Sequence, residues 1–245
     1  MKYQNTTPLH LAELFFGDKA SFGDETHDSL SPTMPEYDTP PNSHSQIMIL
    51  PNFITKEMCT ALRKYADERT AVDLSVFDPD ATNSSGEIQW EVDKSVRDTQ
   101  MVEYDEELGQ QFNQVIGKAV REIINPYYEI DIKSAEAVQF LKYGVGGKYD
   151  VHIDAESLWH VKTENRLEWR KSMDRDISIL IYLNEEYEGG QLVFPNQHIA
   201  LHPKAGMLVA FPSDHHFAHG VMPVTKGTRY ALVTWASLSN LEGEQ

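Results

Sequence analysis

Cysteine is the scarcest chemical group in this sequence. Among its 245 residues, only Cys59 carries a thiol. A single cysteine excludes an intrachain disulfide framework and a zinc cluster built from cysteines. We therefore expect the protein to act in a reducing, cytoplasmic setting.

Basic residues and long apolar runs are also few. The chain has 21 Lys and Arg against 38 Asp and Glu, which gives a net charge of −17. A surface of that sign repels a phosphate backbone. No apolar segment reaches the length of a membrane span, and no basic segment followed by a long apolar run opens the sequence. The expected partners therefore include neither nucleic acid nor a membrane, and the oligomeric state is left open.

The sequence divides into an arm and one domain. Residues 1–45 are polar and rich in proline, which predicts a flexible, loosely structured arm. Residues 46–240 have the length of one catalytic domain with a sizeable core. We expect this domain to carry the function.

Two helices are predicted in the first half of the domain. Apolar residues recur at helical spacing after Thr55, a predicted helix cap, and a short apolar strand precedes them. A polar loop is predicted over residues 78–87. The second apolar stripe begins at Leu108, and Pro126 is expected to end its helix.

The second half of the domain reads mainly as short strands separated by Gly, Pro and Asn turn signals. This pattern predicts a mainly β fold with flanking α-helices, in which two sheets form a jelly-roll sandwich. The predicted strands are residues 135–143, 149–154, 176–184, 190–195, 198–203, 206–212, 219–224 and 229–237.

The predicted strand at 149–154 carries a candidate metal site. Asp150, His152 and Asp154 are spaced by two residues, and residues two apart on a strand share one face. A 2-His-1-carboxylate triad is typical of non-haem Fe(II) oxygenases, because it leaves coordination positions open for cosubstrate and O₂. The spacing leaves the third ligand open. The downstream candidates are His198, His202, His215, His216 and His219.

Three segments together resemble the catalytic domain of prolyl 4-hydroxylases, within the Fe(II)- and 2-oxoglutarate-dependent dioxygenases. They are "KYGVGGKYDVHID", "DRDISILIYLNEEYEGGQLVFP" and "HGVMPVTKGTRYALVTW". With "ILPNFITKEMCTAL", which resembles the entry to that domain, the likeness covers roughly residues 47–238. It implies a double-stranded β-helix core of jelly-roll, cupin-like type. It also implies His152, Asp154 and His219 as the iron ligands and catalytic residues.

The resemblance selects His219 through its register. In the family, the distal histidine precedes a run of the form V-x-P-V-T-x-G-x-R, and the run from Val221 to Arg229 keeps this spacing only after His219. His215 and His216 are interpreted as loop or surface residues. For Asp150, the resemblance implies no ligand role, and we place it behind the ligands or at the rim.

The resemblance also implies a cosubstrate pocket. Arg229, whose planar fork of donors suits a carboxylate, is expected to hold the far carboxylate of 2-oxoglutarate, with help from the hydroxyl of Tyr182. Tyr143 matches a position near cosubstrate or substrate, whereas Tyr149 is interpreted as packing. The pair Gly189 and Gly190 is expected to form a tight bend. Aromatic residues in strands are more often core than ligands, which is the alternative for both binding tyrosines.

The function implied is hydroxylation of a prolyl residue in a peptide or protein, with 2-oxoglutarate converted to succinate. Its cofactor is Fe(II), its cosubstrates are 2-oxoglutarate and O₂, and ascorbate is a candidate reductant. One alternative is the same chemistry on a lysyl residue, a free amino acid or a small molecule. A second is a non-catalytic, cupin-type metal-binding protein, which would not need Arg229. A nucleic-acid demethylase is disfavoured by the acidic composition.

One charged segment fits neither helix nor strand pattern. Residues 155–176 separate the metal strand from the next one and contain Trp159 and Trp169 among charges of both signs. A connection of this length in a compact domain is often functional, which predicts a lid over a bound peptide. The alternative is a solvated surface helix laced with salt bridges.

Overall fold

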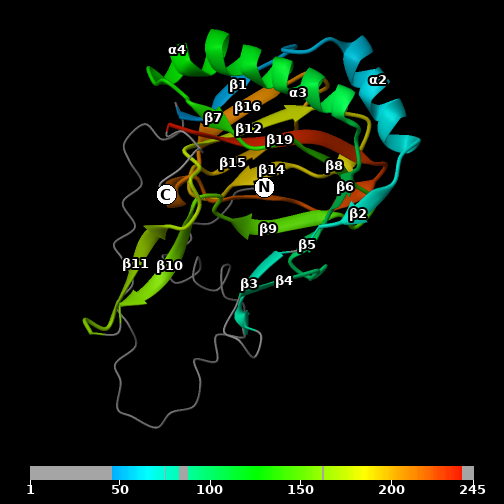
Figure 1. Ribbon diagram of the computed structural model, residues 1–245. Coiled ribbons are helices and arrows are strands. Elements are labelled where there is room, and N and C mark those ends of the chain that lie inside the picture. Colours follow the sequence, from blue (N-terminus) through cyan, green and yellow to red (C-terminus); the bar gives the residue numbers. More distant parts are fainter. Residues whose placement is uncertain (1–45, 75, 83–87, 162, 239–245) are drawn as a thin grey trace.

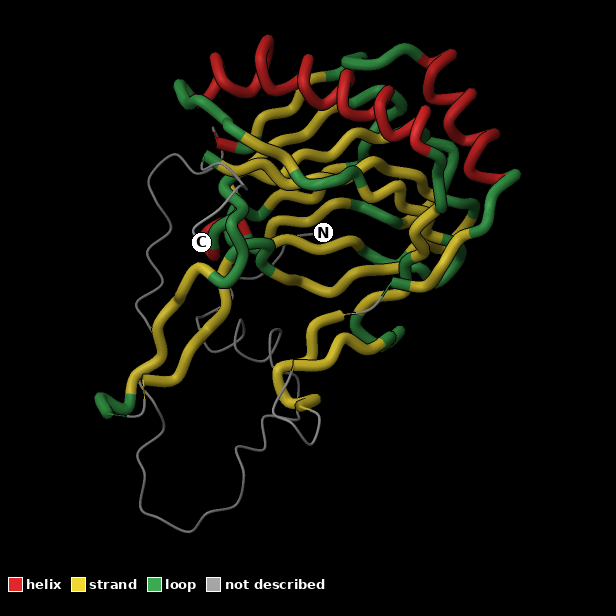
Figure 2. The backbone as a smooth tube through the Cα atoms, viewed as in Figure 1, coloured by secondary structure: helices red, strands yellow, loops and turns green. Residues whose placement is uncertain are grey.

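The computed structural model describes residues 46–74, 76–82, 88–161 and 163–238, with side chains described outside 75–91 (Figure 1). The predicted arm, residues 1–45, lies outside the described residues. Within them, two antiparallel sheets face each other and helices cover one side (Figure 2). The expected mainly β fold with a double-stranded β-helix core and flanking helices is confirmed.

The larger sheet contains eight strands within the described residues. Its central strands come from distant parts of the chain, so the sheet ties the domain together. Their spatial order is β1 (Met48–Leu50), β16 (Leu208–Pro212), β12 (Ile177–Tyr182), β19 (Arg229–Ser237), β8 (Gln139–Tyr143), β6 (Gln100–Val102) and β2 (Ala71–Asp73), with β7 (Ser134–Ala135) beside β19.

The smaller sheet contains five strands and holds the predicted metal strand. Its spatial order is β15 (Ile199–Leu201), β14 (Leu192–Phe194), β17 (His219–Val221), β9 (Lys148–His152) and β5 (Arg97–Asp98). Three two-stranded pairs flank the sheets: β3 (Val76–Thr82) with β4 (Ile88–Glu91), β10 (Glu156–Val161) with β11 (Arg166–Lys171), and β13 (Glu188–Gly189) with β18 (Val224–Lys226).

Two helices lie across the outer face of the larger sheet (Figure 1). The first, α2 (Lys56–Asp67), starts at Thr55, whose Oγ1 accepts a hydrogen bond from the Met58 amide at 3.2 Å, so the predicted cap is confirmed. The second, α3 (Glu106–Ala119), starts at Asp105, which accepts from the Leu108 amide at 3.0 Å. Each cap satisfies an N-terminal N–H that has no partner inside the helix.

The expectation that Pro126 ends the second helix is wrong. A π-helical turn (Val120–Ile124) follows α3, and α4 (Asn125–Tyr128) continues the helical path past the proline. Pro126 lies in the first turn of α4, where its missing N–H costs nothing. The path ends instead at Glu129, whose φ of 56° is left-handed.

Strand β12 contributes side chains to two hydrophobic cores, one on each face of the larger sheet. All six of its residues are buried. Ile179 and Ile181 pack toward the helices, whereas Leu180 and Tyr182 pack between the two sheets. Because successive side chains on a strand point to opposite faces, a continuous apolar run is what a sheet covered on both sides requires.

Two segments differ from the predicted local structure. Residues 78–82 of the predicted loop at 78–87 lie in β3 instead, and residues 83–87 lie outside the described residues. The surface helix considered as the alternative for residues 155–176 is not observed, because this segment forms the β10–β11 hairpin, which projects from the body of the protein (Figure 1). Trp169 of the hairpin stacks on His215. The hairpin therefore contacts the 3₁₀ turn His215–Phe217.

Candidate functional site

The smaller sheet brings the three predicted metal ligands together. His152, the last residue of β9, is register-paired with His219, the first residue of β17. Asp154 lies two residues beyond the end of β9, so it belongs to the bend after the strand rather than to the predicted strand itself. Within the described residues, these three are the group that could hold a metal ion, with ligand atoms all within 4.8 Å of one another.

Backbone carbonyls orient both imidazoles. The Nδ1 of His152 lies 2.8 Å from the Asp150 carbonyl oxygen, and the Nδ1 of His219 lies 3.0 Å from that of Phe217. A carbonyl oxygen only accepts, so each Nδ1 carries the proton and each Nε2 keeps its lone pair. Both Nε2 atoms face Asp154, at 3.5 Å from its Oδ1 for His152 and 3.4 Å from its Oδ2 for His219. This arrangement presents two nitrogens and a carboxylate to one point.

A chain of two hydroxyl groups holds the carboxylate. Ser178 on β12 donates to the Oδ2 of Asp154 at 2.6 Å, and its oxygen lies 2.8 Å from the hydroxyl of Ser213. Burial by itself raises the pKa of Asp154, but His219, His152 and the Ser178 hydrogen bond together lower it below the usual range. The carboxyl group is therefore ionised and fixed in orientation.

Burial also sets the charge of His219. Its side chain is buried, which disfavours the imidazolium cation and lowers the pKa of His219 to about 4, against the opposing effect of Asp154. At neutral pH the imidazole is neutral. A neutral imidazole is the form that binds a metal ion.

A second cluster lies in the same pocket, around Arg229. This arginine is 1% exposed, and its guanidinium carbon lies 4.6 Å from the ring centre of Tyr143 and 5.0 Å from that of Tyr182. The hydroxyl groups of Tyr182 and Tyr187 and the Nε of Arg229 are buried without hydrogen-bond partners among the described residues. Buried polar groups are normally paired, so this cluster has donors ready for an acceptor such as a carboxylate.

The other candidate histidines lie outside the triad. His198 and His202 are exposed. His215 pairs with Glu156 at 2.5 Å and stacks on Trp169 with ring centres 5.1 Å apart, so it fastens the β10–β11 hairpin to the body. His216 follows it in the 3₁₀ turn.

Asp150 and Tyr149 differ in how they relate to the ligands. Asp150 is exposed, and its carboxylate accepts from Lys148 at 2.7 Å, so its side chain is engaged outside the triad. The ring of Tyr149 stacks on His152 with centres 3.6 Å apart. Tyr149 therefore packs against a candidate ligand.

The paired glycines Gly189 and Gly190 form the expected tight bend. Their φ values are 75° and 63°. A Cβ on Gly189 would lie 2.1 Å from the Pro223 carbonyl oxygen, and one on Gly190 would lie 3.1 Å from the Arg229 side chain. Only glycine allows this approach of chain to chain beside the arginine.

Several pocket residues were not predicted from the sequence. Arg97 comes from β5, which pairs with β9. Trp235 lies under the guanidinium of Arg175, whose carbon is 3.7 Å from the ring centre. The full lining is Arg97, Gln139, Tyr143, Tyr149, His152, Asp154, Leu180, Leu192, His219, Val221, Arg229, Val233 and Trp235.

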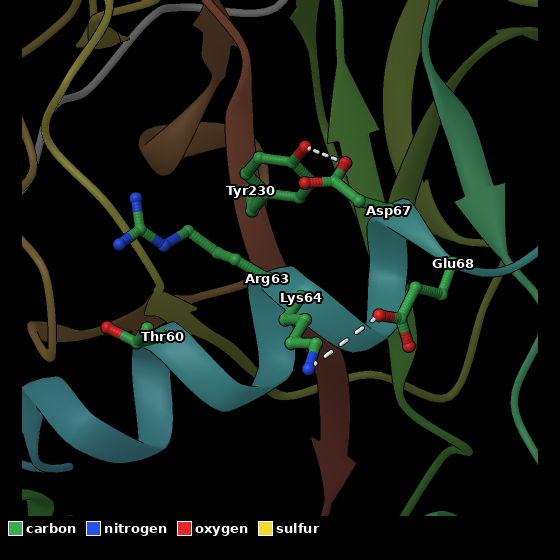
Figure 3. Close-up of a pocket in the computed structure, with 6 residues that line it drawn as sticks. All are labelled: Thr60, Arg63, Lys64, Asp67, Glu68 and Tyr230. Atoms are coloured by element: carbon green, nitrogen blue, oxygen red, sulfur yellow. Dashed lines mark hydrogen bonds and ion pairs between the residues drawn. The ribbon is translucent and has the colours of Figure 1, made fainter.

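A separate hollow lies on the outside of α2, at Arg63 and Tyr230 (Figure 3). Tyr230 donates to Asp67 at 2.5 Å, and Arg63 bonds Glu186 at 2.9 Å. Its charges are thus largely paired within the protein. Tyr230 follows Arg229 on β19, so the strand directs these neighbours to opposite faces.

The sequence of this region matches a known family. Residues 138–237 match the model of the 2OG-Fe(II) oxygenase superfamily, and the match includes all three residues of the triad and Arg229. The region that holds the site therefore matches the sequence of a 2OG-Fe(II) oxygenase domain. Fe(II) and 2-oxoglutarate are accordingly the cofactor and cosubstrate of the domain.

Curated relatives of the oxygenase domain are larger proteins. Prolyl 3-hydroxylase 2 of Homo sapiens is 37% identical over 75 residues, which cover 29% of this chain and 11% of that protein. Prolyl 4-hydroxylase subunit alpha-1 of Gallus gallus is 30% identical over 119 residues, covering 43% and 21% respectively. The chain thus spans only about a tenth to a fifth of the length of these relatives.

Solved structures share the fold of the oxygenase domain. The viral collagen prolyl hydroxylase of Paramecium Bursaria Chlorella virus-1, solved as a 2OG complex, superposes with a TM-score of 0.56 at 19% identity. The match covers 79% of this chain and 97% of that one. At this identity the likeness establishes the architecture of the two sheets.

The residues of the pocket fit both groups that the superfamily name implies. Two imidazoles and one carboxylate are the donor set that Fe(II) takes in such oxygenases. The buried, unpartnered donors at Arg229 and Tyr182 suit the carboxylate of a dicarboxylic cosubstrate. Within the described residues, none of the helices has the length and apolar character needed to cross a membrane.

Proposed function

We propose that this protein hydroxylates a prolyl residue, at C4, in a peptide or protein, as an Fe(II)- and 2-oxoglutarate-dependent dioxygenase. The observation that carries the proposal is the pocket that joins the His152, Asp154 and His219 triad to the buried Arg229 cluster. A site for metal alone would have no use for a buried cation. The non-catalytic cupin-type alternative is therefore not favoured.

Each group in the pocket has a role in this proposal. The Nε2 atoms of His152 and His219 and the carboxylate of Asp154 hold Fe(II), and Ser178 keeps the carboxylate in place. Arg229 and the Tyr182 hydroxyl bind the far carboxylate of 2-oxoglutarate. When bound, the metal supplies the activation of O₂, with oxidation of 2-oxoglutarate to succinate and CO₂.

Apolar side chains line the remaining wall of the pocket. Leu180, Leu192 and Val221 are buried there. They exclude water from the reacting centre, which strengthens the interactions of Arg229 and limits side reactions. The pocket thus combines an apolar wall with the polar cosubstrate end.

The substrate class rests on the relatives. Both curated relatives named above are prolyl hydroxylases, and so is the viral protein of similar fold. The prolyl 3-hydroxylase likeness makes C3 the competing position. Hydroxylation of a lysyl residue, a free amino acid or a small molecule has no observation in its favour. Ascorbate as reductant and a cytoplasmic location remain predictions.

Two measurements test the proposal. Anaerobic addition of Fe(II) and 2-oxoglutarate should produce a visible metal-to-ligand charge-transfer band. A library of proline-containing peptides, incubated with Fe(II), 2-oxoglutarate and O₂, should then gain single oxygen atoms detectable by mass spectrometry. Amino-acid analysis against 3- and 4-hydroxyproline standards assigns the position. A charge-transfer band without any oxidised peptide would contradict the prolyl substrate but keep the cosubstrate chemistry.

A further inference from the structure

A second arginine lines the metal pocket, and nothing in the proposed chemistry uses it. Arg97 on β5 is 8% exposed. Its Nη2 donates to Gln139 Oε1 at 3.3 Å, and its guanidinium carbon lies 4.5 Å from the ring centre of Tyr149. Its Nε is buried with no hydrogen-bond partner, and no carboxylate pairs with it among the described residues. A buried guanidinium held only by an amide and a ring retains unused donors.

The lack of an acidic partner is unexpected in this chain. With 38 Asp and Glu against 21 Lys and Arg, carboxylates are the most numerous charged side chains in the sequence. Burying an unpaired cation is costly unless a ligand completes its hydrogen bonds. The position of Arg97 in the pocket lining makes the substrate the group that can do so.

Strand register places Arg97 at a different part of the pocket from Arg229. Tyr143 on β8 is register-paired with Arg229, whereas Gln139, the partner of Arg97, is paired with Val233. Four residues along a strand correspond to about 13 Å. Arg97 also contacts Tyr149, whose ring stacks on His152, so this second arginine lies beside the metal ligands.

We propose that Arg97 and Gln139 form a subsite that binds a backbone carbonyl oxygen of the substrate peptide next to the target proline. This inference rests on the proposed prolyl hydroxylation. Proline has no backbone N–H, so the polar backbone groups at the target are carbonyl acceptors. A guanidinium is donor-only, and the amide nitrogen of Gln139 adds further donors. The subsite therefore favours a peptide carbonyl beside a proline over a group that can only donate hydrogen bonds.

The first test compares Arg97→Gln and Arg97→Lys with the parent and with Arg69→Gln, a control at an arginine whose side chain is 49% exposed. The peptide is the one that the parent hydroxylates best in the proline-peptide library. Arg97→Gln should lower kcat/KM for this peptide at least tenfold, mainly through KM. Arg97→Lys should recover part of the loss, and Arg69→Gln should match the parent. The affinity for 2-oxoglutarate, measured anaerobically with Fe(II), should stay within twofold in all variants.

The second test identifies the carbonyl. Each amide oxygen of the peptide is replaced in turn by sulfur, a weaker acceptor of nearly the same geometry. In the parent, one substitution beside the proline should lower kcat/KM severalfold, and in Arg97→Gln the same substitution should have no further effect. Gln139→Met provides a second variant if Arg97→Gln does not fold, and it should show the same loss of sensitivity at that position.

Three outcomes would overturn the inference. Parent and variant could be equally sensitive to sulfur at every position, or kcat/KM could be unchanged in Arg97→Gln. A fall in 2-oxoglutarate affinity that accounts for the lost activity would instead assign Arg97 to the cosubstrate. If the parent hydroxylates no peptide of the library, the proposed function itself fails and takes the subsite with it.

Discussion

His152 and His219 are cross-strand neighbours whose imidazole centres lie 4.4 Å apart. The pairing of β9 with β17 joins two residues that are far apart in the sequence. Because each ring is also fixed by its own hydrogen bond to a backbone carbonyl, the two Nε2 atoms are directed before any metal arrives. Preorganisation of this kind lowers the cost of binding.

Substituting a member of the triad should remove the metal without unfolding the domain. We expect His152→Ala, Asp154→Ala and His219→Ala each to abolish Fe(II) retention and 2-oxoglutarate turnover, because two ligands hold the ion too weakly. Metal content after anaerobic gel filtration measures retention, and circular dichroism checks the fold. His216→Ala is the matched control and should retain metal. The opposite pattern, with His219→Ala active and His216→Ala inactive, would refute the assignment.

Arg229→Ala should weaken 2-oxoglutarate binding much more than Fe(II) binding. The substitution removes a charge-assisted pair from a buried site, and we expect a loss of about 2–5 kcal/mol in binding free energy. Titration calorimetry under anaerobic conditions measures both affinities. Arg69→Ala, at a half-exposed arginine, should leave both unchanged. Equal affinity for 2-oxoglutarate in Arg229→Ala and the parent would show that Arg229 does not bind the cosubstrate.

Ser178→Ala should lower the affinity for Fe(II), because Ser178 orients the carboxylate of Asp154. The variant removes the hydroxyl that donates to the carboxylate at 2.6 Å and leaves the ligands themselves in place. Loss of a hydrogen bond behind a metal ligand typically costs about 10–100-fold in metal affinity. Fe(II) affinity measured by competition with a chelator tests this. Ser172→Ala, which alters a hydroxyl at the base of the hairpin, is the control. No change in Ser178→Ala would show that the hydrogen bond does not orient the carboxylate.

Gly189→Ala should destabilise the fold. The new Cβ would meet the Pro223 carbonyl oxygen at 2.1 Å, in a residue whose φ is 75°. Left-handed strain and the clash together should lower the free energy of unfolding by about 3 kcal/mol. Gly144→Ala is the control, because nothing lies within 4 Å of its added Cβ. Urea denaturation of the metal-free protein measures the difference, and similar midpoints for the two variants would contradict the close approach.

Shortening the β10–β11 hairpin should uncouple the reaction. Joining Ser157 to Arg170, which are register partners, through an Asn-Gly turn removes the outer part of the hairpin and both of its tryptophans. The Glu156–His215 contact at its base is kept. We expect hydroxylation of peptide to fall while decarboxylation of 2-oxoglutarate without peptide survives. Unchanged coupled turnover would show that the hairpin does not contact substrate.

The core of the fold could be predicted from the sequence because its local patterns agree with its tertiary environment. The run at β12 is apolar at nearly every position, as a strand covered on both faces requires. Thr55 and the stripe from Leu108 likewise predicted two helices whose caps and buried faces are observed. In these elements, propensity, periodicity and burial favour the same structure.

The hairpins were missed for the opposite reason. The β10–β11 hairpin has little apolar alternation, because its strands are covered by no second layer. Its charges pair along β11, with Glu168 contacting both Arg166 and Arg170. The same charge pattern is compatible with a surface helix, so the sequence alone could not separate the two.

Arg97 could not be found from local sequence. It lies in a two-residue strand far upstream of the H-x-D segment, and only the pairing of β5 with β9 brings it to the pocket. Arg229, by contrast, was accessible because it follows His219 at a fixed spacing in the run that resembles the family motif. The pocket residues recovered from the sequence lie in segments that resemble family motifs, whereas Arg97 lies outside those segments.

The place of β19 in the larger sheet bears on how the domain is made. This strand is the last of the described strands in chain order, yet it lies between β12 and β8 at the centre of the sheet. Until it emerges from the ribosome, the edges of β12 and β8 that pair with it are both open, and the pocket lacks Arg229, which this strand carries. Such late, long-range closure slows folding and exposes aggregation-prone edges. Synthesis of this protein should therefore depend on chaperones that shield nascent strand edges until the final strand is inserted.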